Sequence, residues 1–205
     1  MKHSLLILLL ACFTIQCSNP DTMEDVIVIG GGLMGSSTAW ELSTHGSRVL
    51  LLEQQDVVYT YGSSFGEARI SRSLGVRNDI FSWLQQTSVT ETRKLINYLN
   101  ELGDEVHSMN EIYRTSPVTY IYQASQQREV DNILYHQPDT FRYAPDPSSA
   151  QDLFGMKIPD TAIVIREYKQ YSGTLNPKVL IAKLHEAINS SGNEVRYGQK
   201  VVGLI

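Results

Sequence analysis

The sequence predicts an α/β fold in which a parallel β-sheet is flanked by helices. A first apolar run, Val26–Ile29, consists of β-branched residues without polar alternation, as is typical of a strand buried on both faces. Glycines at positions 30, 32 and 35 follow directly, and a helix is then predicted over residues 36–45. A second apolar run, Val49–Leu52, ends in the acid Glu53. Strand, glycine turn, helix and strand in this order form a Rossmann-like unit.

The glycine turn has the spacing G-x-G-x-x-G of dinucleotide-binding proteins. Gly30 permits a tight turn, Gly32 lets a pyrophosphate approach the backbone, and Gly35 allows the helix to pack closely on the strand. The free amides and the positive dipole end of the helix would face the phosphates. A glycine-rich turn in an unrelated α/β protein is the alternative. The predicted cofactor contacts in this turn are Gly30, Gly31, Gly32, Leu33, Met34 and Gly35.

The acid after the second strand restricts the choice of dinucleotide. A carboxylate at the position of Glu53 accepts hydrogen bonds from both hydroxyls of an adenosine ribose and repels a 2′-phosphate. The ligand is therefore expected to be FAD or NAD rather than NADP. Glu53 and the next residue, Gln54, are both predicted to contact it.

Composition excludes several classes of site. The net charge is −5 and no run of Lys or Arg occurs, so no nucleic-acid partner is expected. The two cysteines, Cys12 and Cys17, both lie near the N-terminus, which leaves the predicted folded part without a disulfide or a thiolate metal site. The five histidines lack metal-ligand spacing, so each is expected on the surface or as a satisfied core residue, and no metal is predicted.

Residues 1–22 have the character of a leader. The apolar stretch over residues 5–15 is too short to span a bilayer but suits the core of a signal peptide. Cys17 then begins a segment similar to the start of a mature bacterial lipoprotein, which predicts a lipid anchor at this cysteine and a membrane-anchored or periplasmic protein. The alternative is translation from Met23, which would give a cytoplasmic enzyme.

A second motif, G-S-S-F-G-E-A-R-I-S-R, covers residues 62–72. Its small residues, among them Gly62 and Ser63, can bring backbone and hydroxyl donors against a ligand without steric cost. On a helical turn Arg69 and Arg72 would project from one face and could bind a carboxylate or a reduced flavin anion. The alternative is a solvated basic face paired with nearby acids.

Residues 26–35, 51–53 and 62–72 together resemble the N-terminal half of monomeric sarcosine oxidase and N-methyl-tryptophan oxidase. These enzymes belong to the D-amino-acid-oxidase-like family of FAD-dependent amine oxidases. The resemblance implies FAD as the cofactor rather than NAD. It also implies that Ser63 lies near the cofactor and that Glu53 binds the adenosine ribose.

The same resemblance assigns roles to residues elsewhere in the chain. Arg69 would lie against the flavin ring, Arg72 would bind the substrate carboxylate, and the backbone near Val201 would meet the adenine. Phe65 stands where sarcosine oxidases carry an active-site histidine, which indicates a changed or more apolar pocket.

The implied reaction is oxidation of the C–N bond of a secondary or N-methyl amino acid, with O₂ as the acceptor. The expected partners are an amino-acid-like substrate with a carboxylate, and O₂; the oligomeric state is left open. An NAD-dependent dehydrogenase is one alternative, because it would share the glycine turn and Glu53. An inactive fragment or non-catalytic lipoprotein that keeps the nucleotide-binding half is another.

Four segments are predicted, in a Rossmann-like FAD-binding domain with an inserted α+β substrate domain. They are a leader (1–22), the first FAD-binding segment (23–75), part of the substrate domain (76–170) and a return segment (171–205). Because the sequence ends within an apolar run, the FAD-binding domain is expected to be C-terminally truncated.

Beyond residue 75, apolar spacing and turn residues predict the remaining elements. Asn176 and Pro177 have the character of an N-cap and a first helical residue, and Gly192 would end that helix. Helices are predicted over 80–102, 124–136, 149–154 and from 177 onward, strands within 114–123 and over 163–165, 194–197 and 200–204, and a turn over 171–175.

Overall fold

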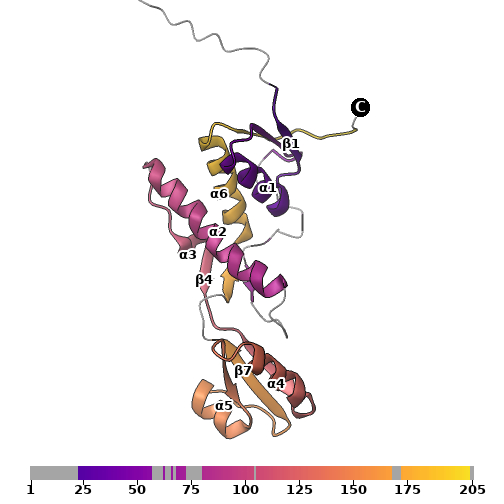
Figure 1. Ribbon diagram of the computed structural model, residues 1–205, viewed down its shortest axis with the longest axis vertical. Helices are drawn as coiled ribbons and strands as arrows, with labels where there is room; N and C mark the ends of the chain where they lie inside the picture. Colours follow the sequence, from indigo (N-terminus) through magenta and orange to yellow (C-terminus); the bar gives the residue numbers. More distant parts are fainter. Residues whose placement is uncertain are drawn as a thin grey trace, which may run out of the picture.

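The computed structural model describes residues 23–56, 62, 66, 68–72, 80–103, 105–167 and 172–203. These residues form an upper and a lower body along one long axis (Figure 1). The upper body contains a parallel sheet and an antiparallel sheet, and the lower body contains a second antiparallel sheet.

The parallel sheet has the strand order β1-β2-β9, with β1 at Val26–Ile29, β2 at Val49–Leu52 and β9 at Glu194–Arg196. Helices α1 (Leu33–Thr44) and α6 (Pro177–Ser190) pack against one of its faces. The predicted strand–turn–helix–strand unit is confirmed, although α1 begins three residues before the predicted helix. The core between helices and sheet contains Val28, Ala39, Val49, Leu51, Ile188 and Val195.

The expectation that β1 is buried on both faces is wrong. Ile27 and Ile29 expose 56% and 54% of their surface. Both helices lie on the face of Val28 and Leu51, whereas Ile27 and Ile29 lie on the opposite face of this strand. The β-branched composition of this segment therefore correctly indicated a strand, but it did not indicate how many of the strand's faces are buried.

The second sheet of the upper body is antiparallel, in the order β3-β8-β4. It contains β3 (Arg69–Ser71), β8 (Gly173–Leu175) and β4 (Tyr113–Thr115), and helix α3 (Met109–Ile112) leads into β4. Helix α2 (Ile80–Leu102) has the predicted bounds and packs against α6. Their common core includes Val89, Leu95, Ile96, Leu99, Leu180 and Leu184.

Two local predictions fail in this sheet. Arg69 lies in an extended strand, so Arg69 and Arg72 do not share a helical turn. The predicted turn over 171–175 contains strand β8. Both segments are short, and the strands form because β8 pairs with β3 on one side and β4 on the other. A Cβ on Gly173 would overlap the carbonyl of Arg114, so only glycine allows this close pairing.

The lower body is a three-stranded antiparallel sheet in the order β5-β7-β6. Its strands are β5 (Thr119–Gln123), β7 (Ala162–Glu167) and β6 (Phe141–Ala144), the last of which had no sequence prediction. A short 3-10 helix, η1 (Ala124–Gln126), leads into α4 (Gln127–His136), and α5 (Pro147–Phe154) follows β6 (Figure 1). The core contains Tyr120, Val130, Ile133, Phe141, Ile163 and Ile165.

Of three further predictions for single elements, one is confirmed and two differ from the structure. The strand expected within 114–123 is two strands, β4 and β5, with Pro117 between them. The N-cap of α6 is confirmed, since the Val179 amide donates to Asn176 Oδ1 at 3.3 Å. Residues 200–203 form no strand, although one was expected there, because no neighbouring strand in the described part of the chain pairs with them.

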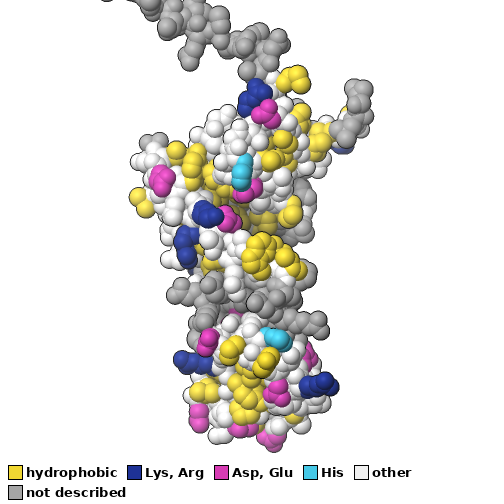
Figure 2. All heavy atoms as spheres, viewed as in Figure 1, with side chains coloured by type: hydrophobic (Ala, Val, Ile, Leu, Met, Phe, Trp, Pro, Cys, Tyr) yellow, Lys and Arg dark blue, Asp and Glu magenta, His cyan; other side chains and the backbone are white. Residues whose placement is uncertain are grey.

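Helix α2 lies within the predicted substrate domain (76–170), yet it packs against α6 in the upper body. The domain boundaries proposed from the sequence therefore stay a prediction. Figure 2 shows hydrophobic side chains where α1 and α2 face each other; Leu33, Val89 and Leu184 are among those lining a hollow of about 660 Å³ there. Among the described residues, no helix has the length and apolar character needed to cross a bilayer.

Candidate nucleotide-binding site

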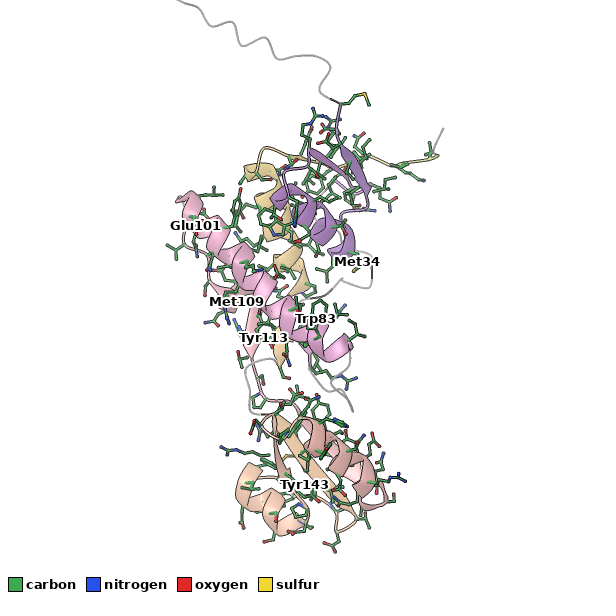
Figure 3. The ribbon with its side chains drawn as sticks, in the orientation of Figure 1. Met34, Trp83, Glu101, Met109, Tyr113 and Tyr143 are labelled. Atoms are coloured by element: carbon green, nitrogen blue, oxygen red, sulfur yellow. The ribbon has the colours of Figure 1, made fainter. Side chains whose placement is uncertain are left out.

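A cavity of about 440 Å³ opens at the carboxyl ends of β1 and β2. This is the edge where ligands bind in open α/β sheets, because the turns that follow the strands diverge there. Met34, labelled in Figure 3, lies on its rim in the first turn of α1. The cavity is lined by Ile29, Gly30, Gly32, Leu33, Met34, Gly35, Leu52, Glu53, Gln54, Gly62, Gln199 and Val201.

Glu53 is the central polar group of this cavity. Its side chain is 2% exposed, and both carboxylate oxygens accept backbone hydrogen bonds. Gly31 N donates to Oε2 at 2.7 Å, and Gln55 N donates to Oε1 at 2.9 Å. An ionised carboxylate has about four acceptor positions, so two remain for other donors. Glu53 is therefore a fixed acceptor at the wall of the cavity, with positions left for further donors.

The turn after β1 is shaped by contacts that only glycine allows. Gly30 has a φ of +101°. A Cβ on Gly31 would lie 3.0 Å from Glu53 Cβ and 3.1 Å from Glu53 Oε2, so a larger residue here would push the acid away from the turn. The first amides of α1 lack intrahelical partners by geometry and lie at the cavity wall with Gly32 and Leu33.

The segment after β9 closes the other side of the cavity. Glu53 N donates to Arg196 O at 2.9 Å, and Gln199 N donates to Glu53 O at 2.8 Å. Gly198 N donates to Gln55 O at 2.8 Å. These hydrogen bonds hold the backbone of residues 196–199 beside that of residues 53–55, and they bring Gln199 and Val201 to the cavity.

Most of the predicted cofactor contacts lie together around this cavity. Those that line it are Gly30, Gly32, Leu33, Met34, Gly35, Glu53, Gln54 and Val201. Gly31 contributes through its amide to Glu53. Ser63 and Phe65 lie outside the described residues, as does Cys17.

The two predicted arginines lie apart from this group. Neither Arg69 nor Arg72 is among the residues that line the cavity. Arg69 Nη1 donates to the carbonyl of Ala68 at 2.9 Å. Burial is the main reason that the pKa of Tyr120 is raised, and the charge of Arg72 opposes that rise. The charge of Arg72 therefore acts on Tyr120 of β5 in the lower body.

Sequence reasoning missed three of the lining residues. Ile29 and Leu52 are the last residues of β1 and β2, and Gln199 follows β9. The rule that ligands meet the carboxyl ends of parallel strands would have found all three once the strands were assigned. Gly62 lines the cavity too, and it begins the second sequence motif.

A buried histidine of α6 lies directly beneath the glycine turn. His185 is 2% exposed; its Nε2 lies 2.7 Å from Ser36 Oγ and its Nδ1 lies 2.6 Å from the Tyr197 hydroxyl. Ser36 Oγ donates to the Gly31 carbonyl at 2.9 Å. This agrees with the expectation of a satisfied core histidine. Burial lowers the pKa of His185, while the nearby Gly31 backbone and the charge of Glu53 oppose the decrease.

This histidine predicts a pH dependence of stability. Because the pKa of His185 is lower in the folded protein than its ordinary value of 6.5, the unfolded chain binds more protons as the pH falls below about 6.5. His185 thus contributes its full stability above that pH and loses it toward the folded pKa. We expect the melting temperature to fall between pH 7.5 and pH 5.5, as measured by circular dichroism.

His185→Gln is the matched control, because it removes the titrating group and keeps a donor and an acceptor. Its melting temperature should fall less over the same interval, whereas an equal fall would contradict the assignment. The titratable groups around His185 are Glu53 and Tyr197. The exposed acids with lowered pKa, Asp25, Asp146 and Glu194, titrate below this interval because their ordinary values are already 3.8 to 4.5.

The sequence profile of the family described as "FAD dependent oxidoreductase" matches residues 25–205. This is most of the chain, and it includes every residue around the cavity. The chain belongs to the FAD dependent oxidoreductase family. The prediction of FAD rather than NAD is thereby confirmed at the level of the family, and the family identified from the sequence motifs is confirmed as well.

Curated relatives of this FAD dependent oxidoreductase include sarcosine oxidases. The chain is 50% identical over 178 residues to the peroxisomal sarcosine oxidase of Homo sapiens, which covers 87% of this chain and 43% of that protein. It is 37% identical over 97 residues to a probable sarcosine oxidase of Arabidopsis thaliana, covering 47% of this chain and 22% of that protein. The chain thus spans less than half the length of these relatives.

The fold of this FAD dependent oxidoreductase also has solved counterparts. The L-proline dehydrogenase of P. horikoshii superposes with a TM-score of 0.66 over 89% of this chain and 46% of that chain, at 18% identity. The Rossmann-like α/β assignment is confirmed by this likeness. At such an identity the comparison establishes the fold alone.

The residues of the cavity fit the adenosine end of FAD. A Cβ on Gly32 would meet nothing within 4 Å, so the turn leaves open space where a pyrophosphate would approach. Glu53 offers a fixed carboxylate for the ribose hydroxyls. Among the described residues, no group of three or more His, Cys, Asp or Glu side chains could hold a metal ion.

Proposed function

We propose that this chain binds FAD in the cavity beside β1 and β2 and forms the cofactor-binding half of an oxidase for secondary or N-methyl amino acids. The observation that carries the proposal is the buried carboxylate of Glu53, held by two amides at the edge where a dinucleotide would lie. Family membership and the sarcosine oxidase relatives support the reaction class.

The residues around the cavity would divide the adenosine half of FAD among them. Glu53 would accept from the ribose hydroxyls, and the first amides of α1 would donate to the pyrophosphate. The backbone near Val201, with Gln199 beside it, would meet the adenine. No charged side chain is needed at the phosphates, because the amides and the helix dipole supply the positive potential.

FAD, when bound, supplies the acceptor for the hydride removed from the carbon next to the substrate nitrogen, and O₂ takes the electrons onward. The chain's part in substrate binding would fall to Arg72, whose guanidinium can hold a carboxylate in a bidentate geometry. The charge of Arg72 acts on Tyr120 and Tyr122 of β5, which supports a substrate position toward the lower body. Arg69 would face the flavin ring.

FAD binding by the purified chain is the direct test. Titration with FAD should quench the flavin fluorescence and saturate at one site, and ADP should compete because it carries the same adenosine pyrophosphate. NADH is the comparator: tight binding of NADH with no binding of FAD would support a dehydrogenase and overturn the proposal. In the complete enzyme, sarcosine and other N-methyl amino acids should yield peroxide.

Arg72→Ala in the complete enzyme should raise KM for carboxylate substrates by about 100-fold, because a bidentate charged pair is lost, while FAD stays bound. Arg93→Ala is the matched control, since Arg93 is an exposed arginine of α2 outside the cavity. Steady-state kinetics and the flavin absorbance of both variants provide the measurement. An unchanged KM in Arg72→Ala would refute the assigned role.

We also propose that the leader carries a lipid anchor at Cys17. The sequence pattern of a basic start, an apolar core and a cysteine supports it. Metabolic labelling with radioactive palmitate should mark the wild type and not Cys17→Ser. Labelling of neither protein, with recovery of both in the cytoplasmic fraction and an N-terminus at Met23, would support the internal start instead.

A further inference from the structure

The glycine turn after β1, Gly30 to Gly32, is the proposed phosphate-binding turn, and hydrogen bonds from two sides hold it at one residue, Gly31. Its amide donates to Glu53 Oε2 at 2.7 Å, and its carbonyl accepts from Ser36 Oγ at 2.9 Å. All of these groups are buried. The first partner follows β2 and the second lies in α1, so the turn is tied to two different elements.

Ser36 is in turn backed by His185 of α6, at 2.7 Å. The hydroxyl of Ser36 donates its single proton to the Gly31 carbonyl, so it accepts from His185. Nε2 of His185 therefore carries the proton, and Nδ1 accepts from the Tyr197 hydroxyl at 2.6 Å. Every hydrogen bond in the series then has one donor and one acceptor.

We propose that His185 is a positioning residue for the phosphate-binding turn: acting through Ser36, it fixes the carbonyl of Gly31 while Glu53 fixes the amide of the same residue. The inference deepens the proposed function, because it concerns the same cofactor site. It assigns the role to a residue of α6 that does not line the cavity and lies far from the glycine motif in sequence.

The physical reason is the freedom of the glycine backbone. Three glycines in succession, Gly30 to Gly32, can rotate their peptide planes at little steric cost. A turned plane would direct a carbonyl, instead of an amide, toward the pyrophosphate. Hydrogen bonds at both the N–H and the C=O of Gly31 select one orientation before the ligand arrives, which lowers the entropic cost of binding.

Four variants of the purified chain test the proposal: His185→Phe, His185→Gln, Ser36→Ala, and the double variant His185→Phe with Ser36→Ala. His107→Phe is the matched control, because His107 is also a buried histidine, lies within 3.4 Å of Glu186 of α6 and is not among the cavity-lining residues. The readouts are the dissociation constants of FAD and ADP, the melting temperature, and amide hydrogen exchange of residues 30–36 without ligand.

His185→Phe should weaken FAD and ADP binding about tenfold, the effect of one lost hydrogen bond. Ser36→Ala should weaken both to a similar extent, and the double variant should be no worse than either single one, because all three interrupt the same series. His185→Gln should restore binding to within about threefold of wild type, since its amide can donate and accept. His107→Phe should lower the melting temperature without changing either constant.

Hydrogen exchange tests whether His185 positions the glycine turn, and this test does not depend on the proposed function. The amides of residues 30–36 should exchange faster in ligand-free His185→Phe than in the wild type, and at wild-type rates in His107→Phe. If the wild type binds neither FAD nor ADP, the proposed function fails while this comparison still judges the positioning role. Unchanged exchange of residues 30–36 in His185→Phe, or additive losses of affinity in the double variant, would overturn the inference.

Discussion

Gly32→Val abolishes FAD binding and leaves the fold intact; this is the result we expect with the greatest effect. A Cβ at this position would meet no protein atom within 4 Å in the ligand-free chain, so we expect the fold to accommodate the substitution. The side chain would, however, occupy the space that the pyrophosphate needs. We expect the dissociation constant for FAD to rise by more than about 100-fold, or about 2.7 kcal/mol.

Gly35→Val is the matched partner of this variant, and it should behave in the opposite way. A Cβ on Gly35 would overlap the carbonyl oxygen of Gly30, so the substitution should separate α1 from β1 and destabilise the ligand-free protein. Circular dichroism melts distinguish the loss of stability expected for Gly35→Val from the loss of ligand contact expected for Gly32→Val, which should leave the melting temperature unchanged. A Gly32→Val protein with wild-type affinity for FAD would show that the pyrophosphate lies elsewhere.

Glu53→Gln should have the second largest effect. The carboxylate accepts from two amides, those of Gly31 and Gln55. A glutamine can accept through one atom only, and its NH₂ group would face the other amide proton, which costs about 1–3 kcal/mol in a buried site. With the ribose contact also impaired, FAD affinity should fall by about 10² to 10³-fold, and the melting temperature should decrease even without ligand.

Glu194→Gln provides the control for the change in charge. It removes the same charge from the adjacent strand of the same sheet, where the exposed carboxylate pairs with Arg196. Exposed ion pairs contribute little, so stability and FAD affinity should stay close to the wild type. Equal losses in the two variants would mean that net charge, and not the buried geometry of Glu53, governs binding.

Local signals were sufficient for the first strand, turn, helix and second strand. The glycine spacing, the apolar run and the acid are all encoded within one stretch of chain, so Gly30 to Glu53 could be placed without knowing the rest of the fold. The cap at Asn176 and the apolar face of α6 were also readable, because each depends on neighbours in sequence.

Non-local pairing accounts for what could not be predicted. Two short strands pair with each other across a long separation in sequence, β3 (Arg69–Ser71) and β8 (Gly173–Leu175). A segment of three residues is too short to show a periodic apolar pattern, so neither strand could be predicted from its own sequence. The exposure of Ile27 and Ile29 depends on which face of the parallel sheet α1 and α6 pack against, and this cannot be read from the strand itself. Gln199 reaches the cavity because residues 196–199 bond to residues 53–55, a register invisible from either segment alone.

The placement of β9 beside β2 has a consequence for biosynthesis. The cavity wall formed by Gln199 and Val201, and the support that His185 gives to the turn, come from the last described segment of this chain. A ribosome that has made β1, α1, β2 and Glu53 has therefore made the glycine turn and its direct partners, Ser36 and Glu53, but not the later segment that supports Ser36 and completes the cavity wall. The nascent chain would keep the apolar face of Leu51 without its partner Ile188 until α6 emerges, so this face stays exposed during synthesis and is open to non-specific association.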